Sequence, residues 1–351
     1  MKLSRISSIL TLAIAVLLCS CQTNESSFVS VKDGKFASKD YPSHFLGTNF
    51  WYGAILASDG QGGDMERLEQ ELDILKENGL TNLRILVGGD GPDGVPTRIM
   101  PTLQKEPGVY NDTIFRGLDR LLVEMAERGM KAVLYMNNSW EWSGGYGMYL
   151  EWAGEGKAVI PAEVGYRAYC ESVSRFITND KAKELFADHV RHVVSRTNTV
   201  TGKPYKDDPT IFSWQIGNEP RCFSHDSLNQ QMFADWMWET AALIKSIDPN
   251  HMVSSGSEGY HGCEQNMELF DWLTALYEIW KNLDKQVVRF SNLTAMGELM
   301  KNGCTTCVDH HYVFPEGAGD LLGAQFAAAD ELGMRMFATR GSMDLSRKDG
   351  G

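Results

Sequence analysis

One pattern recurs along the chain and constrains its fold more than any other feature: an amphipathic helix, a glycine and then a short apolar strand. It occurs in residues 71–88, 118–136, 295–310 and 326–339. The glycines concerned are Gly79, Gly129, Gly303 and Gly333. Each stands where a helix needs a left-handed residue before the chain turns back. The strands that follow are nearly continuous apolar runs, which is typical of parallel strands buried on both faces. The pattern therefore predicts an α/β fold.

Counting these strands suggests a specific architecture. Strands are expected near residues 45, 82, 131, 211, 252, 304 and 334. This gives seven strands, one fewer than a closed (β/α)8 barrel requires. The expected fold is therefore of the (β/α)8 TIM-barrel type, incomplete or chimeric. Long loops are expected at residues 88–112 and 137–162, on the C-terminal side of strands, where barrel enzymes hold their active sites.

The net charge of the chain argues against one class of partner, the polyanions. Among 351 residues, 43% are hydrophobic, and the formal net charge is −13. A negative protein repels polyanions, so a nucleic-acid partner is not expected. A neutral polymer is compatible with this charge.

The first residues form a separate segment. Lys2 and Arg5 precede the apolar run at 9–18, which is too short to span a bilayer as a mature helix. The run ends in "LCSC", which resembles a bacterial lipobox with Cys21 as the lipidated residue. We therefore expect a lipoprotein signal peptide at 1–20, a flexible tether at 21–27 and export to the outer membrane or cell surface, with membrane attachment only through the lipid. An ordinary signal peptide is the alternative.

A carboxylate follows one of the buried strands. The apolar stretch at 211–216 runs into Asn218, Glu219 and Pro220, and the proline stops further strand pairing. Glycoside hydrolysis requires an acid that protonates the leaving oxygen, a second carboxylate and hydrogen bonds to the sugar. Glu219 and Asn218 fit the first and third requirements. The alternative is that these residues form only a turn at the end of the strand.

Similar side chains follow other strands. Asn137 and Trp140 come after the strand near 131, Trp51 comes after the first strand, and Arg84 lies on the second. Amides can bond sugar hydroxyls, aromatic faces can stack on sugar rings, and a guanidinium can keep a carboxylate ionised. The alternative for each tryptophan is packing in the core. Together these residues predict a sugar-binding site.

The motifs that carry these residues resemble one family. They are "GTNFWY" (47–52), "NLRILVGG" (82–89), "NNSWEWSGG" (137–145), "DPTIFSWQIGNEPR" (208–221) and "SSGSEGYHG" (254–262). Residues 28–268 resemble the endo-β-1,4-mannanases of glycoside hydrolase family 5, which are (β/α)8 retaining hydrolases.

The resemblance implies a role for each matching residue. Glu219 would be the general acid/base, Asn218 would contact the substrate 2-hydroxyl, and Arg84 would orient the nucleophile. Trp140 would line the cleft, and Trp51 is a weaker correspondence. The implied substrate is β-mannan, glucomannan or galactomannan, with no cofactor and no metal.

The chain departs from that family where the nucleophile should be. The family has a glutamate at the end of the seventh strand, whereas here that strand ends in Thr339-Arg340-Gly341. Glu258 follows the fifth strand, and Asp309 and Glu316 lie near the sixth. The family's sixth-strand His-x-Tyr motif would correspond to His310 and Tyr312.

The last part of the chain resembles a different family. Residues 269–351, including "GCTTCVDHHYVFP" (303–315), resemble the amidohydrolase superfamily near the 8-oxoguanine and hydroxytriazine deaminases. Most metal ligands of that superfamily are missing, and adjacent His310 and His311 would point to opposite faces of a strand. The sequence therefore predicts a hybrid whose junction lies near 265–273.

Three functions remain open at this point. The first is an exported endo-β-1,4-mannanase, with weak activity expected because the nucleophile is not found. The second is a metal-dependent amidohydrolase acting on a purine-like or triazine-like base. The third is a non-catalytic lipoprotein that binds mannan.

Overall fold

The computed structural model describes residues 26–257 and 279–341, which form two compact units. The first unit contains residues 26–164 and 168–257, and the second contains residues 279–341 together with 165–167. Cys21, the predicted signal peptide at 1–20 and Glu258 lie outside the described residues.

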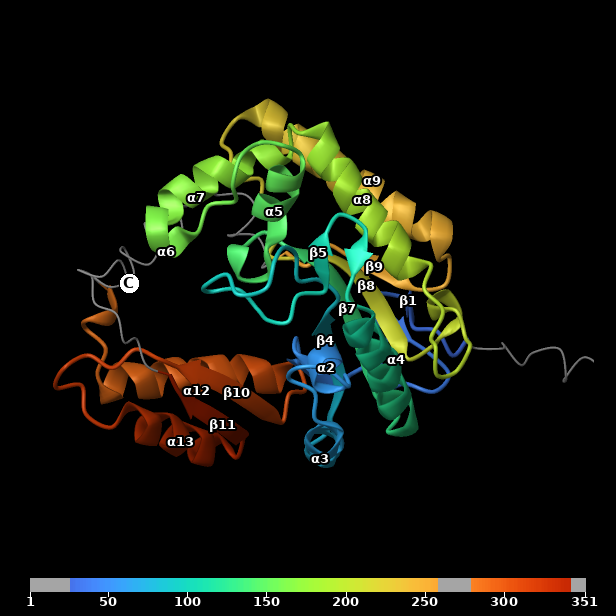
Figure 1. Cartoon of the computed structure of the whole chain (residues 1–351). Helices are drawn as coiled ribbons and strands as arrows, with labels where there is room; N and C mark the ends of the chain where they lie inside the picture. Colours follow the sequence, from blue (N-terminus) through green and yellow to red (C-terminus); the bar gives the residue numbers. More distant parts are fainter. Residues whose placement is uncertain (1–25, 258–278, 342–351) are drawn as a thin grey trace, which may run out of the picture. The chain divides into compact units, whose positions relative to one another are not determined.

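The centre of the first unit is a five-stranded sheet with the order β3-β4-β7-β8-β9 (Figure 1). The strands are β3 (Leu46–Asn49), β4 (Leu80–Leu86), β7 (Lys131–Asn138), β8 (Ile211–Asn218) and β9 (Met252–Ser254). Every neighbouring pair is parallel. The order in space follows the order in the chain, as in a (β/α)8 barrel. The fold is therefore α/β and of the TIM-barrel type.

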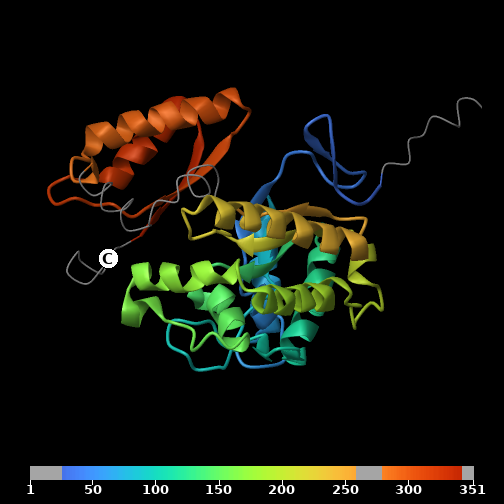
Figure 2. The ribbon, with the colours of Figure 1, turned by 90° about the horizontal axis from the view of Figure 1, so that it is seen from above.

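Helices cover the outside of this sheet. The longer ones are α3 (Met65–Glu77), α4 (Asp112–Glu127), α8 (Asp180–Val194) and α9 (Ser227–Ile247). Helix α3 contacts β4, α4 contacts β7, and α9 contacts both β8 and β9. Helices α8 and α9 lie side by side (Figures 1 and 2). Each of the four begins after an Asp or Asn whose side chain accepts a backbone N–H, the usual N-cap arrangement.

The glycines that mark the recurring unit behave as predicted. Gly79 and Gly129 have φ angles of 79° and 67°, and Gly303 and Gly333 have φ angles of 84° and 71°. No heavy atom lies within 4 Å of a Cβ built at any of the four. The requirement for glycine therefore comes from the left-handed backbone and not from lack of space.

The two long segments after β4 and β7 were predicted as loops, but they contain short elements. The first holds the hairpin β5 (Gln104–Glu106) and β6 (Val109–Tyr110), and the second holds a 3₁₀ turn at 141–143 and α5 (Gly145–Trp152). The remaining elements before residue 257 are β1 (Ser30–Lys32), β2 (Lys35–Ala37), α2 (Gly53–Leu56), α6 (Pro161–Val164), α7 (Tyr166–Val173) and 3₁₀ turns at 174–176 and 205–207. Strands of two or three residues and helices of one or two turns are too short for a hydrophobic period to reveal them.

The second unit contains the last two predicted strands. Strands β10 (Thr306–His311) and β11 (Arg335–Arg340) pair in parallel, and α12 (Lys285–Lys301) and α13 (Leu321–Leu332) accompany them. All seven predicted strands are thus present in the described residues, five in one sheet and two in another. Within the described ranges, no helix is both long and apolar enough to cross a membrane.

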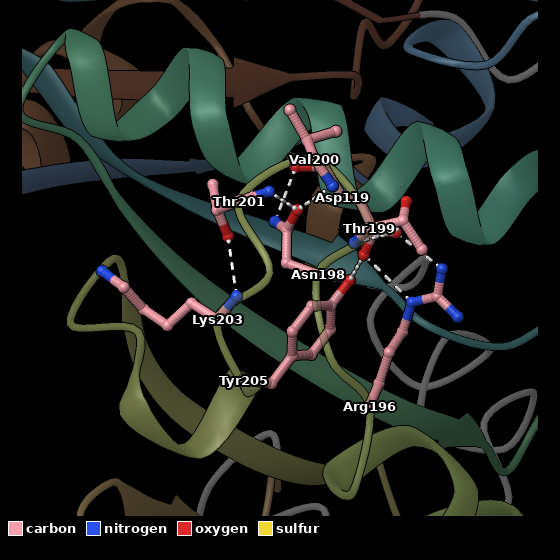
Figure 3. A network of polar contacts seen from close by, with 8 residues as sticks. All are labelled: Asp119, Arg196, Asn198, Thr199, Val200, Thr201, Lys203 and Tyr205. Carbon is pink, nitrogen blue, oxygen red and sulfur yellow. Dashed lines mark hydrogen bonds and ion pairs between the residues drawn. The ribbon is translucent and has the colours of Figure 1, made fainter.

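A buried polar network ties α4 to the segment between α8 and β8 (Figure 3). The Asp119 carboxylate is fully buried and accepts hydrogen bonds from Arg196 (2.6 and 3.0 Å), from the Tyr205 hydroxyl (2.6 Å) and from Thr199. Burial acts to raise the pKa of Asp119, but the bonds from Arg196, Tyr205 and Thr199 outweigh it and leave the pKa below its usual value. The network fixes the chain that leads into β8.

Candidate active site

Glu219 stands directly after β8 in a strained backbone conformation. Its φ angle is +48°, in the left-handed region that costs a non-glycine residue about 1–2 kcal/mol. Two hydrogen bonds hold this conformation: the Glu219 N–H donates to the Gly256 carbonyl at 3.0 Å, and the Ser139 hydroxyl donates to the Glu219 carbonyl at 2.7 Å. Strain of this kind is common at functional sites, where the surrounding structure maintains it.

The hydrogen bond from the Glu219 N–H to Gly256 requires the backbone after β9 to approach the backbone of β8 closely. A Cβ at Gly256 would lie 1.8 Å from the Gly217 carbonyl oxygen, and Gly256 has a φ angle of +86°. Only glycine fits this position. The close approach brings the Gly256 carbonyl within reach of the Glu219 N–H.

The half-buried Glu219 side chain has a specific partner. Its Oε2 accepts a 2.8 Å hydrogen bond from the indole Nε1–H of Trp140. Trp140 is only 7% exposed, and its ring packs against the rings of Tyr169 and Phe223. In the structure Trp140 lies against Glu219 and the two other rings, and its role in lining a cleft stays a prediction.

Asn218 has a defined amide orientation. It is in register with Asn138 on β7, and its Nδ2 donates to the Asn138 Oδ1 at 3.2 Å. Its Oδ1 accepts from the Arg84 Nη1 at 2.9 Å. The amide is therefore held between strands β7 and β4, next to Glu219.

Arg84 reaches from β4 across the sheet. Its guanidinium lies 4.1 Å from the centre of the Tyr135 ring on β7. It donates to three amide oxygens, those of Gln215 (2.6 Å), Asn218 (2.9 Å) and Asn49 (3.2 Å). Burial lowers the pKa of Arg84, and the charges of Tyr135 and Glu219 oppose that shift. Among the described residues, Arg84 forms no ion pair with a carboxylate, so the nucleophile that the resemblance places beside it is not found there.

Gln215 belongs to this group of side chains, although the sequence analysis did not identify it. Besides accepting from Arg84, it donates through Nε2 to the Ser254 hydroxyl of β9 at 3.2 Å. The sequence could have indicated it, because Gln215 is the only long polar side chain in the otherwise mostly apolar strand at 211–216. We refer to Glu219, Asn218, Arg84, Gln215 and Trp140 as the Glu219 site.

Two other predicted sugar-binding residues have different surroundings. Trp51 is 39% exposed, and its ring meets that of Trp142 at a centroid distance of 6.2 Å. Asn137 is 2% exposed, and its Oδ1 accepts the Asn138 N–H at 2.6 Å. Nothing here tests their contact with a sugar, which stays a prediction.

The second unit carries the predicted His-x-Tyr pair. The Nδ1 of His310 lies 2.6 Å from the Thr339 hydroxyl on β11, and its ring centroid is 5.9 Å from that of Tyr312. The neighbouring His311 instead contacts Phe314 and also Gln325, which lies on α13. The roles of His310 and Tyr312 in catalysis stay predictions. Asp309, one of the possible nucleophiles, is hydrogen-bonded to Gln325 at 2.5 Å.

Comparison with known proteins identifies the relatives of this chain. The family described as "GH family 5 beta-mannosidase-like" matches residues 26–281. Mannan endo-1,4-beta-mannosidase 1 of Arabidopsis thaliana is 32% identical over 242 residues, which are 69% of this chain and 53% of the relative. Mannan endo-1,4-beta-mannosidase 1 of Oryza sativa subsp. japonica is 35% identical over 237 residues, which are 67% of this chain and 50% of the relative. The chain spans about half the length of these curated relatives.

Solved structures give the same result. A mutant glycoside hydrolase family 5 mannosidase from Rhizomucor miehei, in complex with mannosyl-fructose, has 38% sequence identity and a TM-score of 0.60, covering 66% of this chain and 56% of that one. A second mutant of a family 5 mannosidase from that organism has 26% identity and a TM-score of 0.64, covering 90% of this chain and 85% of that one. Coverage of 90% extends past residue 281 into the second unit.

These findings also bear on the second resemblance. They support the family 5 relationship and give no support to an amidohydrolase origin of residues 269–351. In the parts of the chain that the structure describes, no group of three or more His, Cys, Asp or Glu side chains is placed to hold a metal ion. The chain belongs to glycoside hydrolase family 5, in its beta-mannosidase-like group.

Proposed function

We propose that the Glu219 site acts on the glycosidic bonds of β-mannan-type polysaccharides, with Glu219 as the general acid/base of a retaining mechanism. The observation that carries this proposal is the convergence of Glu219 and Asn218, at the carboxyl end of β8, with Arg84 of β4, which donates to the Asn218 amide. The relatives named as mannan endo-1,4-beta-mannosidases support the choice of a mannan, and the proposal extends to glucomannan and galactomannan.

Each residue has a role in this proposal. Glu219 gives a proton to the leaving glycosidic oxygen, because glycoside hydrolysis uses a carboxylic acid as its general acid. Asn218 bonds a hydroxyl of the sugar, and its amide is already oriented by Arg84 and Asn138. Trp51, exposed beside Trp142, offers an aromatic surface to a sugar ring.

The activity of the chain depends on whether a second carboxylate is present to act as the nucleophile. Retaining hydrolysis needs a nucleophile about 5 Å from the acid/base. Among the described residues, no carboxylate forms a hydrogen bond or ion pair with Arg84, and strand β11 ends without an acidic residue. We therefore expect hydrolysis of β-mannan to be slower than in an enzyme with a nucleophile by several powers of ten.

An external nucleophile tests this proposal. Azide, added to an aryl β-mannobioside, can attack the anomeric carbon from the face opposite the aryl group. A carbon–nitrogen bond forms, the carbon–oxygen bond breaks, and the aryl oxygen takes its proton from Glu219, which yields an α-mannosyl azide. We expect azide to accelerate aryl release, and Glu219→Gln to suppress that acceleration by about a hundredfold or more.

Two other results would point elsewhere. Binding of mannohexaose by calorimetry, without hydrolysis and without an azide effect, would favour a non-catalytic mannan-binding protein. Rapid mannan hydrolysis that Glu219→Gln abolishes would show that a nucleophile is present. Glu258, Asp309 and Glu316 would then be replaced in turn to identify it.

The amidohydrolase alternative is not favoured. His310 and His311 face different neighbours, Thr339 and Gln325 respectively, so a regular strand does not direct both to one metal. Elemental analysis of the purified protein checks this point, since a stoichiometric bound zinc ion would contradict it.

Export and lipidation of Cys21 form a separate proposal, supported by the apolar run at 9–18 and the "LCSC" motif. In bacterial cells fed labelled palmitate, we expect the label to be incorporated into the chain and to be lost in Cys21→Ala. Retention of the label in that variant would contradict lipidation at this residue.

A further inference from the structure

We infer that Trp140 is a positioning residue for Glu219, and that it directs the transferable proton to the Oε1 atom of that carboxyl group. This inference rests on the proposed function of Glu219 as proton donor. It differs from the role that the sequence assigned to Trp140, which was to line a sugar-binding cleft.

The surroundings of the indole ring support positioning over stacking. The ring is stacked on Tyr169 at a centroid distance of 6.1 Å and an interplanar angle of 18°. Phe223 meets it edge-on at 5.3 Å, and the Arg221 guanidinium lies 5.3 Å from the ring centre. With 7% of the residue exposed, the ring offers little surface to a sugar. Its most specific contact is the 2.8 Å hydrogen bond to the Glu219 Oε2.

The residue before Trp140 holds the main chain of Glu219. The Ser139 hydroxyl donates to the Glu219 carbonyl at 2.7 Å and accepts the Arg221 N–H at 3.1 Å. Tyr169 donates to the Ser139 carbonyl at 2.5 Å, so the same tyrosine supports both Ser139 and the Trp140 ring. The dipeptide Ser139-Trp140 therefore fixes the backbone of Glu219 through one residue and its carboxyl group through the other.

The chemistry of indole determines which oxygen carries the proton. Indole Nε1–H is a donor only, whereas a protonated carboxyl group has one O–H and one oxygen that still accepts. The carbonyl oxygen of a protonated carboxyl group is its better acceptor, so Oε2, which accepts from Trp140, takes that place. The acidic proton therefore resides on Oε1.

A spectroscopic experiment tests the hydrogen bond without requiring activity. The indole N–H resonance of Trp140 is assigned in ¹⁵N-labelled protein by its loss in Trp140→Phe. If that variant does not fold, the resonance is assigned by its proximity to Tyr169 and Phe223. We expect the resonance to shift in Glu219→Gln, because a neutral amide then replaces the accepting carboxyl group. A resonance that is unchanged in Glu219→Gln would overturn the inference.

The kinetic test separates positioning from sugar binding. In Trp140→Phe, which keeps a ring but removes the donor, we expect the azide-supported kcat to fall about tenfold with KM changed less than twofold. A raised KM with unchanged kcat would instead identify Trp140 as a sugar-binding surface and refute the inference.

A matched control exists in the same strand that precedes Glu219. The indole N–H of Trp214 donates to the Asp248 carboxylate at 2.6 Å, and both residues are fully buried. Trp214→Phe removes the same type of bond, and we expect it to lower the melting temperature without the tenfold fall in azide-supported kcat. If azide-supported turnover is absent while the Trp140 resonance still responds to Glu219→Gln, the proposed function fails and the hydrogen bond stands.

Discussion

The Asp119 network and the Glu219 site each combine a carboxylate with an arginine, but they treat the charges differently. Asp119 is fully buried and forms a direct ion pair with Arg196, to which Tyr205 and Thr199 add hydrogen bonds (Figure 3). Glu219 is half-buried, and Arg84 binds only neutral amide oxygens. The first network balances its charge internally, whereas the second leaves a cation without a carboxylate partner among the described residues.

This difference suggests that the Asp119 network stabilises the fold, whereas the Glu219 site is arranged to bind a substrate. A buried carboxylate whose oxygens are all occupied has no capacity left for a ligand, so its hydrogen bonds stabilise the fold. The Glu219 site carries backbone strain at its central residue and has an unbalanced guanidinium. Groups arranged in this way are suited to interact with a substrate, at some cost in stability.

The largest effect is expected from breaking the balanced pair. Asp119→Asn keeps the shape of the side chain but leaves Arg196, whose side chain is 13% exposed, without its counter-charge. We expect the free energy of unfolding to fall by about 3–5 kcal/mol in urea denaturation. Glu127→Gln, on the exposed side of the same helix, is the control and should change stability by less than about 0.5 kcal/mol. Similar stability of Asp119→Asn and the control would contradict this comparison.

His189 tests the cost of charging a buried group whose partners are neutral. It is 1% exposed between the Val87 carbonyl (2.9 Å) and the Tyr110 hydroxyl (3.3 Å), and burial lowers its pKa to about 4. Above pH ~6.5 the residue is neutral in both the folded and the unfolded state. As the pH falls from about 6.5 to about 4, the unfolded chain takes up a proton that the folded protein does not, so stability falls by on the order of 3 kcal/mol.

The measurement for His189 is urea denaturation at pH 7 and at pH 4.5. His189→Gln should lose much less stability than the unsubstituted protein between these two values. Replacement of the exposed His225 by Gln is the control for removing a histidine from the surface. An equally steep loss in His189→Gln would show that other groups cause the acid sensitivity.

Replacing Arg84 should affect ligand binding more than stability, in contrast to replacing Asp119. In Arg84→Met the exposed Asn49 and the half-buried Gln215 can turn their amide oxygens to water, and a partly desolvated charge is removed. We expect stability to change by no more than ~1.5 kcal/mol, while the affinity for mannohexaose falls at least tenfold by calorimetry. A stability loss as large as that of Asp119→Asn would mean that Arg84 is mainly structural.

The smallest effect is expected from giving Arg84 the counter-charge that it lacks. Gln215→Glu keeps the length of the side chain and replaces a neutral acceptor, 2.6 Å from the Arg84 Nε, with an anionic one. We expect a gain of ~1 kcal/mol in stability, because hydrogen bonds between charged groups are stronger. Loss of stability in this variant would contradict the view that the charge of Arg84 is unbalanced.

Local sequence signals were sufficient for much of the fold. Gly79 and Gly129 mark the ends of helices through backbone conformation alone, and the apolar runs after them identify strands β4 and β7. Such signals need no tertiary contact, because they depend on the residue's own φ preference and on period. The short hairpin β5–β6 was missed because strands of two or three residues present no period.

The sequence alone determined the parallel strand order, the family and the position of Glu219 after β8, since each is carried by a contiguous motif or a local repeat. Only the tertiary structure decided which groups meet. Gln215 binds Arg84 across 131 positions of sequence, and Trp140 bonds Glu219 across 79, because strand register brings distant residues to one end of the sheet. Register and side-chain packing are set by the whole sheet, which is why the motif alone did not reveal that Trp140 lies almost buried against Glu219.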